Sequence, residues 1–368
     1  MTARREQGGG PGPHARMPAE WEPHDATWIA WPHERSDWPG KFSTIPWTYA
    51  EIVRRLSSDE YVEVLVQSPA QLGRARRVLT RSAVDLERVR FHVCPTDRSW
   101  TRDSGPSFVR TGPASSAAEA PLALVQWKFT GWAKYDNWQL DRGVPEWIAR
   151  HLGLPLHKAL SGSRWVVCEG GAFDVDGSGL LLATEECLLG EPQARNPGLG
   201  REALESVLRE YLGVEEVIWL RRGILGDDTH GHVDDVARFV GPRAVVTVTT
   251  DDPSDLDFSA LSENREVLDA YRSRGGARLD VRELPVPRPV LFGGLRLPAS
   301  YANFYVANRT VLVPTFDDPR DADAIDVLRK AFPGREAVGI RARDLVWGFG
   351  TIHCLTQQQP AARRASGR

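Results

Sequence analysis

The chain has 368 residues and a formal net charge of −3, with 46 basic residues balanced by 49 acidic ones. This balance, without any basic block, argues against nucleic-acid binding. No apolar run approaches the roughly 18 residues that a membrane helix needs, and the first residues lack the apolar core of a secretory signal. Four cysteines without a Cys-x-x-Cys pair predict a reduced, cytoplasmic protein with no structural zinc site.

Both ends of the sequence are predicted to be disordered tails. Residues 1–16 are rich in glycine, proline and charge, and residues 362–368 have a similar composition. Between them, residues 17–361 are long enough to bury a large apolar core without disulfides. We therefore expect a single domain over residues 17–361.

Short segments rich in β-branched and aromatic residues predict strands along the whole chain. In order, they lie at residues 26–32, 62–67, 89–94, 122–129, 164–171, 179–186, 216–222, 235–240, 244–250, 302–308 and 310–316. Amphipathic patterns predict helices at residues 46–58, 70–81, 144–153, 200–213, 262–274 and 321–332. Strands that alternate with helices throughout indicate an α/β fold.

These elements also form a repeat of two strands joined by a turn, then a helix, then another strand. The units begin near residues 24, 102, 169, 230 and 301, and the middle ones follow at steps of about 65 residues. Five such units predict a closed, five-fold α/β propeller in one domain, in which equivalent positions converge on the axis. An open, doubly wound sheet is the alternative.

Polar motifs stand at the starts of several predicted strands. They are WTRDSGP with Trp100 and Asp103, CEGGAF with Glu169, DDTHGHVDDVARF with His232 and Asp234, and GTIHC with Cys354. Taken singly, Asp103 could close a turn, Glu169 could be an exposed strand end, and Cys354 could be a small buried hydrophobe. Asp234 alternates with His232, so both are expected on one face of a strand. Their joint occurrence at equivalent places predicts an active site on the axis.

These residue types together suit a guanidine substrate. Two converging carboxylates can hold a planar guanidinium through its several N–H donors. A nearby cation favours the thiolate form of a cysteine, which can then attack the guanidine carbon. A histidine can protonate the leaving ammonia and then deprotonate the attacking water. The pattern therefore predicts hydrolysis at a guanidine carbon, with Cys354 as nucleophile and His232 as acid and base.

On these motifs, and on MPAEWEPHDATWIAWP at Met17, RNP at Arg195 and HCLTQQQPA ending at Ala361, the sequence resembles the agmatine deiminases. These belong to the Porphyromonas-type peptidylarginine deiminase family within the guanidine-modifying pentein superfamily. The resemblance covers nearly the whole chain. It implies a five-fold pseudosymmetric α/β propeller and no metal or cofactor. It also implies hydrolysis of agmatine to N-carbamoylputrescine and ammonia, a step in putrescine and polyamine biosynthesis, through a covalent amidino-cysteine intermediate.

The resemblance further implies a role for each site residue. Cys354 would be the nucleophile and His232 the acid and base. Glu169 would hold the guanidine and orient His232, while Asp103 and Asp234 would grip the guanidine nitrogens. The sequence leaves the oligomeric state open, and a homo-oligomer is compatible with it.

The substrate's aliphatic tail is less well determined. Trp100 is expected to line the pocket beside it. Phe349 and Thr351 replace a glycine and an asparagine that the family has beside the nucleophile, Asp235 stands where asparagine is common, and residues 131–141 are unlike the usual glycine-rich loop. These departures leave agmatine, free arginine, peptidyl arginine and another guanidino metabolite as candidate substrates.

A carboxylate on the tail, as in free arginine, would need a cation near the pocket mouth. None of the motif segments supplies an obvious one, because Arg102 on a predicted strand would point away from Asp103. Agmatine, whose tail ends in an ammonium, is therefore the expected substrate.

Three other classes of protein are alternatives. A metal-dependent ureohydrolase could use His230, His232, Asp234 and Asp235 as ligands, but a binuclear site needs further clusters that the sequence does not contain. An amidinotransferase would use the same cysteine, histidine and carboxylates and pass the amidine to an amine. A non-catalytic ring that binds a partner would have no need of these residues.

Overall fold

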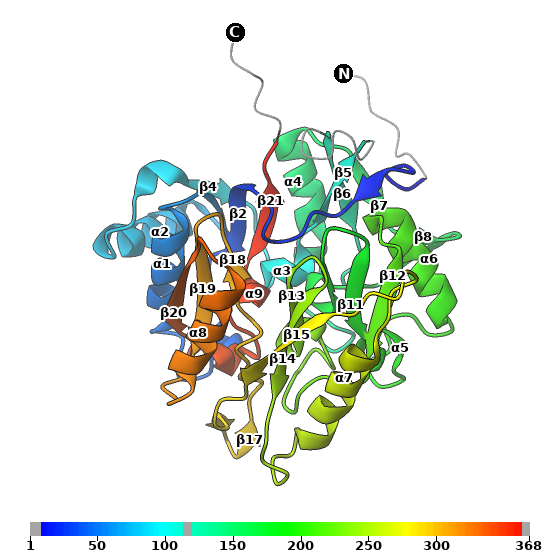
Figure 1. Cartoon of the computed structure of the whole chain (residues 1–368). Coiled ribbons are helices and arrows are strands. Elements are labelled where there is room, and N and C mark those ends of the chain that lie inside the picture. The colour runs from blue at the N-terminus through cyan, green and yellow to red at the C-terminus, as the bar shows by residue number, and fades with distance from the viewer. Residues whose placement is uncertain (1–8, 113–119, 363–368) are drawn as a thin grey trace.

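A computed structural model describes residues 9–112 and 120–362. Its strands form five main sheets on one plan: an antiparallel pair, a helix, and a strand parallel to the second member of the pair. The five units surround a common centre, with the longer helices on the outside (Figure 1). This arrangement confirms the predicted α/β propeller, and the separate sheets rule out one open, doubly wound sheet.

Units 1 to 4 are continuous in sequence. Unit 1 contains β5 (Ser107–Thr111), β6 (Leu122–Gln126), α4 (Val144–Leu152) and β7 (Leu156–Lys158). Unit 2 contains β10 (Phe173–Val175), β11 (Leu180–Thr184), α5 (Glu185–Leu189), α6 (Arg201–Leu212) and β12 (Glu216–Leu220). Unit 3 contains β13 (Ala237–Gly241), β14 (Ala244–Thr249), α7 (Phe258–Ala270) and β15 (Asp280–Pro285). Unit 4 contains β18 (Tyr305–Val306), β19 (Thr310–Thr315), α8 (Asp321–Ala331) and β20 (Glu336–Arg341).

Unit 5 joins the two ends of the chain. It contains β21 (Gln357–Pro360), β2 (His24–Ala30), α1 (Ile45–Leu56) and β3 (Tyr61–Val66), followed by α2 (Pro69–Arg81) and β4 (Val89–Val93). β21 pairs antiparallel with β2, and the Trp28 indole donates to Gln359 Oε1 at 2.9 Å. The prediction that the first unit carries its own hairpin is therefore wrong, because the partner strand comes from the other end of the chain. This pairing closes the ring.

The remaining elements are short. Two small hairpins are β8–β9 (Leu160–Ser161, Arg164–Trp165) and β16–β17 (Leu291–Phe292, Leu295–Arg296). The short helical turns are η1 (Arg35–Asp37), η2 (Leu86–Arg88), α3 (Thr101–Ser104), η4 (Asp141–Gly143), η5 (Gly170–Ala172), η6 (Val233–Asp235), η7 (Leu345–Gly348) and α9 (Ile352–Leu355). The strand predicted over residues 164–171 is broken after Trp165 and ends in η5, where two glycines interrupt the extended backbone.

The N-terminal segment is ordered earlier than predicted. Ala15–Arg16 form β1, which pairs with Thr111 and Arg110 of β5. The segment packs closely against the C-terminal end of α6, at Gly213. A Cβ at this position would lie 1.7 Å from the Ala15 carbonyl oxygen, and the φ of 68° also favours glycine. Residues 1–8 and 363–368 of the predicted tails lie outside the described residues.

Local sequence explains why the main elements form. In α1, Ile45, Tyr49, Ile52, Val53 and Leu56 recur at helical spacing and are buried, so one face packs into the core. The middle strands of the units, such as β6 and β11, are buried along their whole length. No helix in the described part of the chain is long and apolar enough to cross a membrane.

Short turns bring the polar motifs to the centre of the ring. α3, η5, η6 and α9 lie immediately before the first strands of units 1, 2, 3 and 5, respectively. α3 contacts both α9 and η5, and η5 contacts η6. In Figure 1, α3 and α9 accordingly lie near the middle of the molecule. Equivalent positions of the units therefore converge, as the repeat predicts.

Candidate active site

The predicted site residues all lie on or beside these central turns: Trp100 and Asp103 at α3, Glu169 before η5, His232 and Asp234 at η6, and Cys354 in α9. The expectation that His232 and Asp234 share one face of a strand is wrong. His232 is the N-cap of η6 and Asp234 lies within η6, so neither residue is on a strand. Both side chains nevertheless approach Gly171, where a Cβ would lie 2.5 Å from His232 Nδ1 and 3.0 Å from Asp234 Oδ2. His232 lies near Asp103 and Glu169, whereas Asp234 contacts His353 and Cys354.

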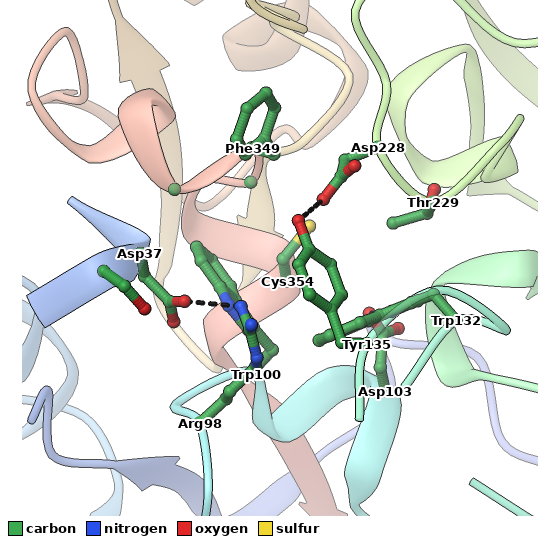
Figure 2. Close-up of a pocket in the computed structure, with 13 residues that line it drawn as sticks. Asp37, Arg98, Trp100, Asp103, Trp132, Tyr135, Asp228, Thr229, Phe349 and Cys354 are labelled. Atoms are coloured by element: carbon green, nitrogen blue, oxygen red, sulfur yellow. Dashed lines mark hydrogen bonds and ion pairs between the residues drawn. The ribbon is translucent and has the colours of Figure 1, made fainter. Parts of the chain in front are cut away.

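Trp100, Asp103 and Cys354 line a cavity of about 190 Å³. Figure 2 shows Asp103 and Asp37 on opposite sides of Trp100, with Cys354 between them and Phe349 above. The rest of the lining comes from connecting segments, some between units and some within units 1 and 5: Ser36, Asp37, Arg98, Trp132, Tyr135, Asp228, Thr229, Gly348, Phe349 and Gly350. His232, Glu169 and Asp234 lie behind the cavity wall.

The Cys354 thiol is buried among carboxylates. The side-chain amide of Asn303 donates to Sγ at 3.1 Å, and Asp234 Oδ2 lies 3.7 Å from Sγ. Burial, and then the nearby carboxylates, chiefly Asp234, raise the pKa of Cys354 well above its usual value. The thiol is therefore neutral in the free protein, and a cation bound among these carboxylates would favour the thiolate.

Asn303 holds the segment that carries the nucleophile. Its Oδ1 accepts hydrogen bonds from Thr351 Oγ1 at 2.8 Å and from the His353 amide at 3.0 Å. Thr351, which departs from the family pattern, thus fixes the amide that contacts Sγ. Asn303 was missed in the sequence, although it lies two residues before β18 of unit 4. The repeat itself was the signal, since this place corresponds to the motif positions of the other units.

The second departure, Asp235, is an aspartic acid that behaves as a neutral group. It is buried, and its Oδ1 accepts a hydrogen bond from Asn303 Nδ2 at 3.0 Å. Burial, and then the charge of Asp234, raise the pKa of Asp235 well above its usual value. A protonated carboxyl has nearly the shape and the charge of an asparagine amide, so the substitution leaves the local charge unchanged.

The His232 ring lies between two carboxylates without a hydrogen bond to either. Nε2 is 3.5 Å from Glu169 Oε2, and Nδ1 is 3.8 Å from Asp103 Oδ1. Both ring nitrogens are buried and lack a hydrogen-bond partner. Burial favours the neutral ring, but Asp103, together with Cys187 and Glu169, outweighs it and raises the pKa of His232 well above its usual value. The charged ring can therefore donate a proton to a nearby leaving group.

Glu169 is held from the other side by Arg195. The Arg195 Nε atom lies 3.3 Å from Glu169 Oε1, and both side chains are fully buried. Burial acts to raise the pKa of Glu169, but the charges of Arg195 and His232 lower it below its usual value. Arg195 belongs to the RNP motif, and its role as counter-ion was not predicted.

Asp103 is fixed at both carboxylate oxygens. The Gly171 amide donates to Oδ1 and the Trp132 indole donates to Oδ2, each at 2.9 Å. A Cβ at Gly171 would lie 2.5 Å from His232 Nδ1, which explains the glycine of the CEGGAF motif. Burial raises the pKa of Asp103 to about 6, because the nearby His232 charge only partly offsets it.

Asp234 is the inner end of a chain of buried charges. Its Oδ2 lies 2.7 Å from His353 Nδ1, and His353 Nε2 lies 2.9 Å from Glu20 Oε2. Arg102 lies in α3 rather than on a strand, and it points away from Asp103 toward Glu20 at 3.0 Å. Burial acts to raise the pKa of Asp234, but the hydrogen bond from His353 keeps it below its usual value. Asp234 Oδ1 is buried and has no hydrogen-bond partner.

A cation from outside the motif segments, Arg98, lines the cavity. Arg98 forms an ion pair with Asp37 and donates to Asn137 Oδ1. Its guanidinium also lies 3.9 Å from the centroid of the Tyr135 ring. Burial raises the pKa of Asp37 to about 6 against the charge of Arg98. Asp37 Oδ2 is buried and makes no hydrogen bond of good geometry.

The suggested ureohydrolase ligand set is not brought together. The His230 side chain is 23% exposed and lies 3.9 Å from Glu186, away from the buried His232. One group in the described chain could hold a metal ion, formed by Glu169, Cys187 and His232. The sequence-based prediction that the protein needs no metal stays a prediction.

Comparisons with known proteins identify the family of the chain. Residues 16–360 match the family described as Porphyromonas-type peptidyl-arginine deiminase. An agmatine deiminase of Ectopseudomonas mendocina is 35% identical over 95% of this chain and 96% of its own, and that of Pseudomonas aeruginosa is also 35% identical, with the same coverage. The solved agmatine deiminase of Enterococcus faecalis is 31% identical, with a TM-score of 0.86 over 97% of this chain and 99% of its own.

Proposed function

Since this chain belongs to the Porphyromonas-type peptidyl-arginine deiminase family, we propose that it is an agmatine deiminase. It hydrolyses agmatine to N-carbamoylputrescine and ammonia. The observation that carries this proposal is the convergence of a buried thiol, a charged histidine and three carboxylates around one cavity. A guanidinium has the charge and the N–H donors that these carboxylates require.

The end of the cavity that Cys354 and Asp103 line, together with Asp234, Glu169 and His232 directly behind it, is called the guanidine end. Asp103 and Asp234 accept hydrogen bonds from the guanidine nitrogens. Asp234 Oδ1 has no hydrogen-bond partner in the free protein, so binding breaks no existing bond at this atom. Glu169 orients His232 and is itself kept charged by its buried contact with Arg195.

Binding of the substrate cation activates the nucleophile. The carboxylates that hold the thiol neutral in the free enzyme are neutralised by the guanidinium, so the pKa of Cys354 falls and the thiol proton is released to solvent as the substrate binds. The thiolate attacks the guanidine carbon and forms a C–S bond. His232 gives its proton to the departing nitrogen as the C–N bond breaks, and ammonia leaves. His232 then takes a proton from water, whose oxygen attacks the same carbon, and the C–S bond breaks to release the ureido product.

The opposite end, formed by Asp37, Arg98, Tyr135, Asp228 and Phe349, is called the tail end. Trp100 lies between the two ends and provides an apolar surface for the four methylene groups (Figure 2). Asp37 Oδ2 is the carboxylate oxygen left without a good partner, so we assign the tail ammonium to Asp37. Arg98 is the one observation that favours a tail carboxylate, as in free arginine. Its N–H groups are already engaged by Asp37 and Asn137.

Side-by-side kinetics on agmatine, arginine, a blocked arginine peptide and 4-guanidinobutyrate test the substrate. We expect agmatine to exceed the others in kcat/KM by at least about tenfold, since 1.4 kcal/mol is about tenfold and an unpaired buried carboxylate costs more. Arginine or the peptide matching agmatine would overturn the substrate while leaving the deiminase chemistry in place.

Two further measurements separate the other reaction classes. A ureohydrolase would release urea, would lose activity on dialysis against EDTA and would recover it with manganese. An amidinotransferase would release ammonia slowly unless an acceptor amine were added. We expect ammonia release that survives EDTA, is abolished by iodoacetamide, and does not depend on an added amine.

A further inference from the structure

A group of three reactive side chains shares two residues with the guanidine end and adds a third, Cys187. Glu169, Cys187 and His232 each offer one atom that can bind a metal, and these three atoms all lie within 4.8 Å of one another. All three side chains are buried, with Cys187 1% exposed. The proposed reaction uses Glu169 and His232 but has no role for Cys187.

Cys187 is held beside His232 by a specific backbone link. The Thr184 hydroxyl accepts a hydrogen bond from the Cys187 amide at 3.1 Å and donates one to the Gly231 carbonyl. It therefore ties the first turn of α5 in unit 2 to the residue that precedes His232 in unit 3. Cys187 is a free thiol, so its sulfur is available as a ligand.

The other independent observation is at His232 itself. Neither of its ring nitrogens has a hydrogen-bond partner, although the residue is completely buried. Buried polar atoms are normally paired, so a nitrogen left open in this way is a candidate ligand atom. His232 Nε2 lies 3.5 Å from Glu169 Oε2, and the Cys187 sulfur is within 4.8 Å of both ligand atoms.

Nitrogen, thiolate sulfur and carboxylate oxygen are the ligand types that zinc prefers. With bonds of about 2.0–2.3 Å, the ligand atoms of a tetrahedral zinc site lie roughly 3.3–3.8 Å apart. His232 Nε2 already lies 3.5 Å from Glu169 Oε2, within this range, and no two of the three ligand atoms are more than 4.8 Å apart. Three protein ligands would leave a fourth position open for water.

We propose that Glu169, Cys187 and His232 form a Zn²⁺ site whose occupation reversibly inhibits the enzyme. The inhibition rests on the proposed function, because a zinc ion on His232 takes the lone pair needed for proton transfer and also engages Glu169. Zinc binds the deprotonated forms of thiols and imidazole rings, so its binding is coupled to proton release. The Arg195 guanidinium beside Glu169 repels the ion, so the site responds to added zinc and is not a resident metal centre.

The first test compares zinc inhibition in three proteins: wild type, Cys187→Ser and Cys94→Ser. Cys94 is a second buried free cysteine, in a different core cluster, and is the matched control. Each zinc titration is expressed relative to the same protein's rate without zinc, and EDTA is added at the end. We expect the half-inhibiting zinc concentration to rise at least about tenfold in Cys187→Ser alone, with EDTA restoring the wild-type rate. Equal inhibition of wild type and Cys187→Ser would overturn the proposal.

A second test does not depend on activity. The nucleophile is itself a thiol that could bind zinc, so metal binding is measured in Cys354→Ser. Co²⁺ should give a thiolate-to-metal charge-transfer band in this variant, and the band should be lost when Cys187→Ser is added. Loss of the band in Cys354→Ser alone would place the ion on the nucleophile and reject the Cys187 site.

Crystals of Cys354→Ser soaked in ZnCl₂ locate the ion directly by anomalous scattering, whether or not a Cys187 variant folds. Density between Glu169, Cys187 and His232 is expected, and zinc found elsewhere or nowhere would refute the site. A wild-type protein that releases no ammonia from any guanidine would instead refute the proposed function. The cobalt spectra and the anomalous scattering would still test the metal site, because neither depends on activity.

Discussion

At the guanidine end of the cavity, the carboxylates of Asp103, Glu169 and Asp234 are buried on turns that directly precede or begin the inner strands. At the tail end, Arg98, Tyr135, Asp228 and Phe349 are only partly buried and come from loops that connect the strands and helices; Asp37 is the buried exception. The first set is fixed by the repeated architecture, whereas the second depends on loops that can change without disturbing the ring. We infer that the chemistry is set by the ring and the choice of substrate tail by the loops.

The largest expected effect is at the nucleophile. Cys354→Ser should abolish formation of the ureido product, because serine lacks an accessible anionic form at this site, while guanidine binding and folding persist. Mass spectrometry of an acid-quenched wild-type reaction should show an amidino adduct on Cys354. Variants of Cys94 and Cys168 provide the control. Near wild-type turnover in Cys354→Ser would show that Cys354 is not the nucleophile.

Next in size are the two carboxylates of the clamp. Asp103→Asn and Asp234→Asn keep the side-chain shape and remove the charge. Breaking a buried charge pair costs roughly 3–5 kcal/mol, so guanidine binding should weaken by about two to three decades. Calorimetric titration into the Cys354→Ser background measures this without turnover. His232→Ala is the contrasting variant, since it should lower kcat much more than binding; unchanged binding in both Asn variants would contradict the clamp.

At the tail end, Asp37→Asn should act on agmatine selectively. Hydrogen bonds to charged groups are worth about 1.5–3 kcal/mol, so kcat/KM for agmatine should fall about ten- to a hundredfold. The value for 1-butylguanidine, which has no tail ammonium, should change less than about threefold. Asp228→Asn is the matched control, because Asp228 is already engaged by Lys134 and Tyr135. Equal losses for both substrates would show that Asp37 acts through local folding and does not bind the ammonium.

The two ends should also differ in their response to pH. Burial raises the pKa of both Asp103 and Asp37 to about 6, and each carboxyl binds a cation only when ionised. As the pH falls below about 6, kcat/KM for agmatine should lose the contributions of both groups, whereas 1-butylguanidine should lose only that of Asp103. The logarithmic slopes should therefore differ by about one on the acid side. Parallel slopes for the two substrates would leave Asp37 without a role in tail binding.

The smallest effect concerns Phe349. This residue has φ of 65°, a left-handed conformation that costs a non-glycine residue of the order of 1 kcal/mol. Phe349→Gly should relieve this strain and widen the tail end, while the guanidine end stays intact. We expect the ratio of kcat/KM for a blocked arginine peptide to that for agmatine to rise by less than about tenfold. A large loss of agmatine turnover would mean that Phe349 also supports the nucleophile segment.

Much of the fold could be predicted because its local signals agree with the global arrangement. Buried strands such as β11 and amphipathic helices such as α1 carry their own periodicity, and the repeat of these elements predicted five units. The pairing of β2 with β21 could not be predicted, since it joins opposite ends of the chain and depends on backbone hydrogen bonds that carry no sequence pattern. The ordered strand β1 was missed for a related reason, because its only signal is contact with β5 and α6.

By itself, the sequence determined the residue types at the guanidine end: the WTRDSGP, CEGGAF, GHVDD and GTIHC motifs mark the turns that meet in one site. Only the tertiary structure decided how these residues are paired, as in Arg195 with Glu169, His353 with Asp234 and Asn303 with Cys354. It also decided that Asp37, Arg98 and Cys187 come near the site at all. The physical reason is that a motif identifies the residue types next to a strand. Burial, charge interactions and hydrogen bonds between units arise only when the ring closes.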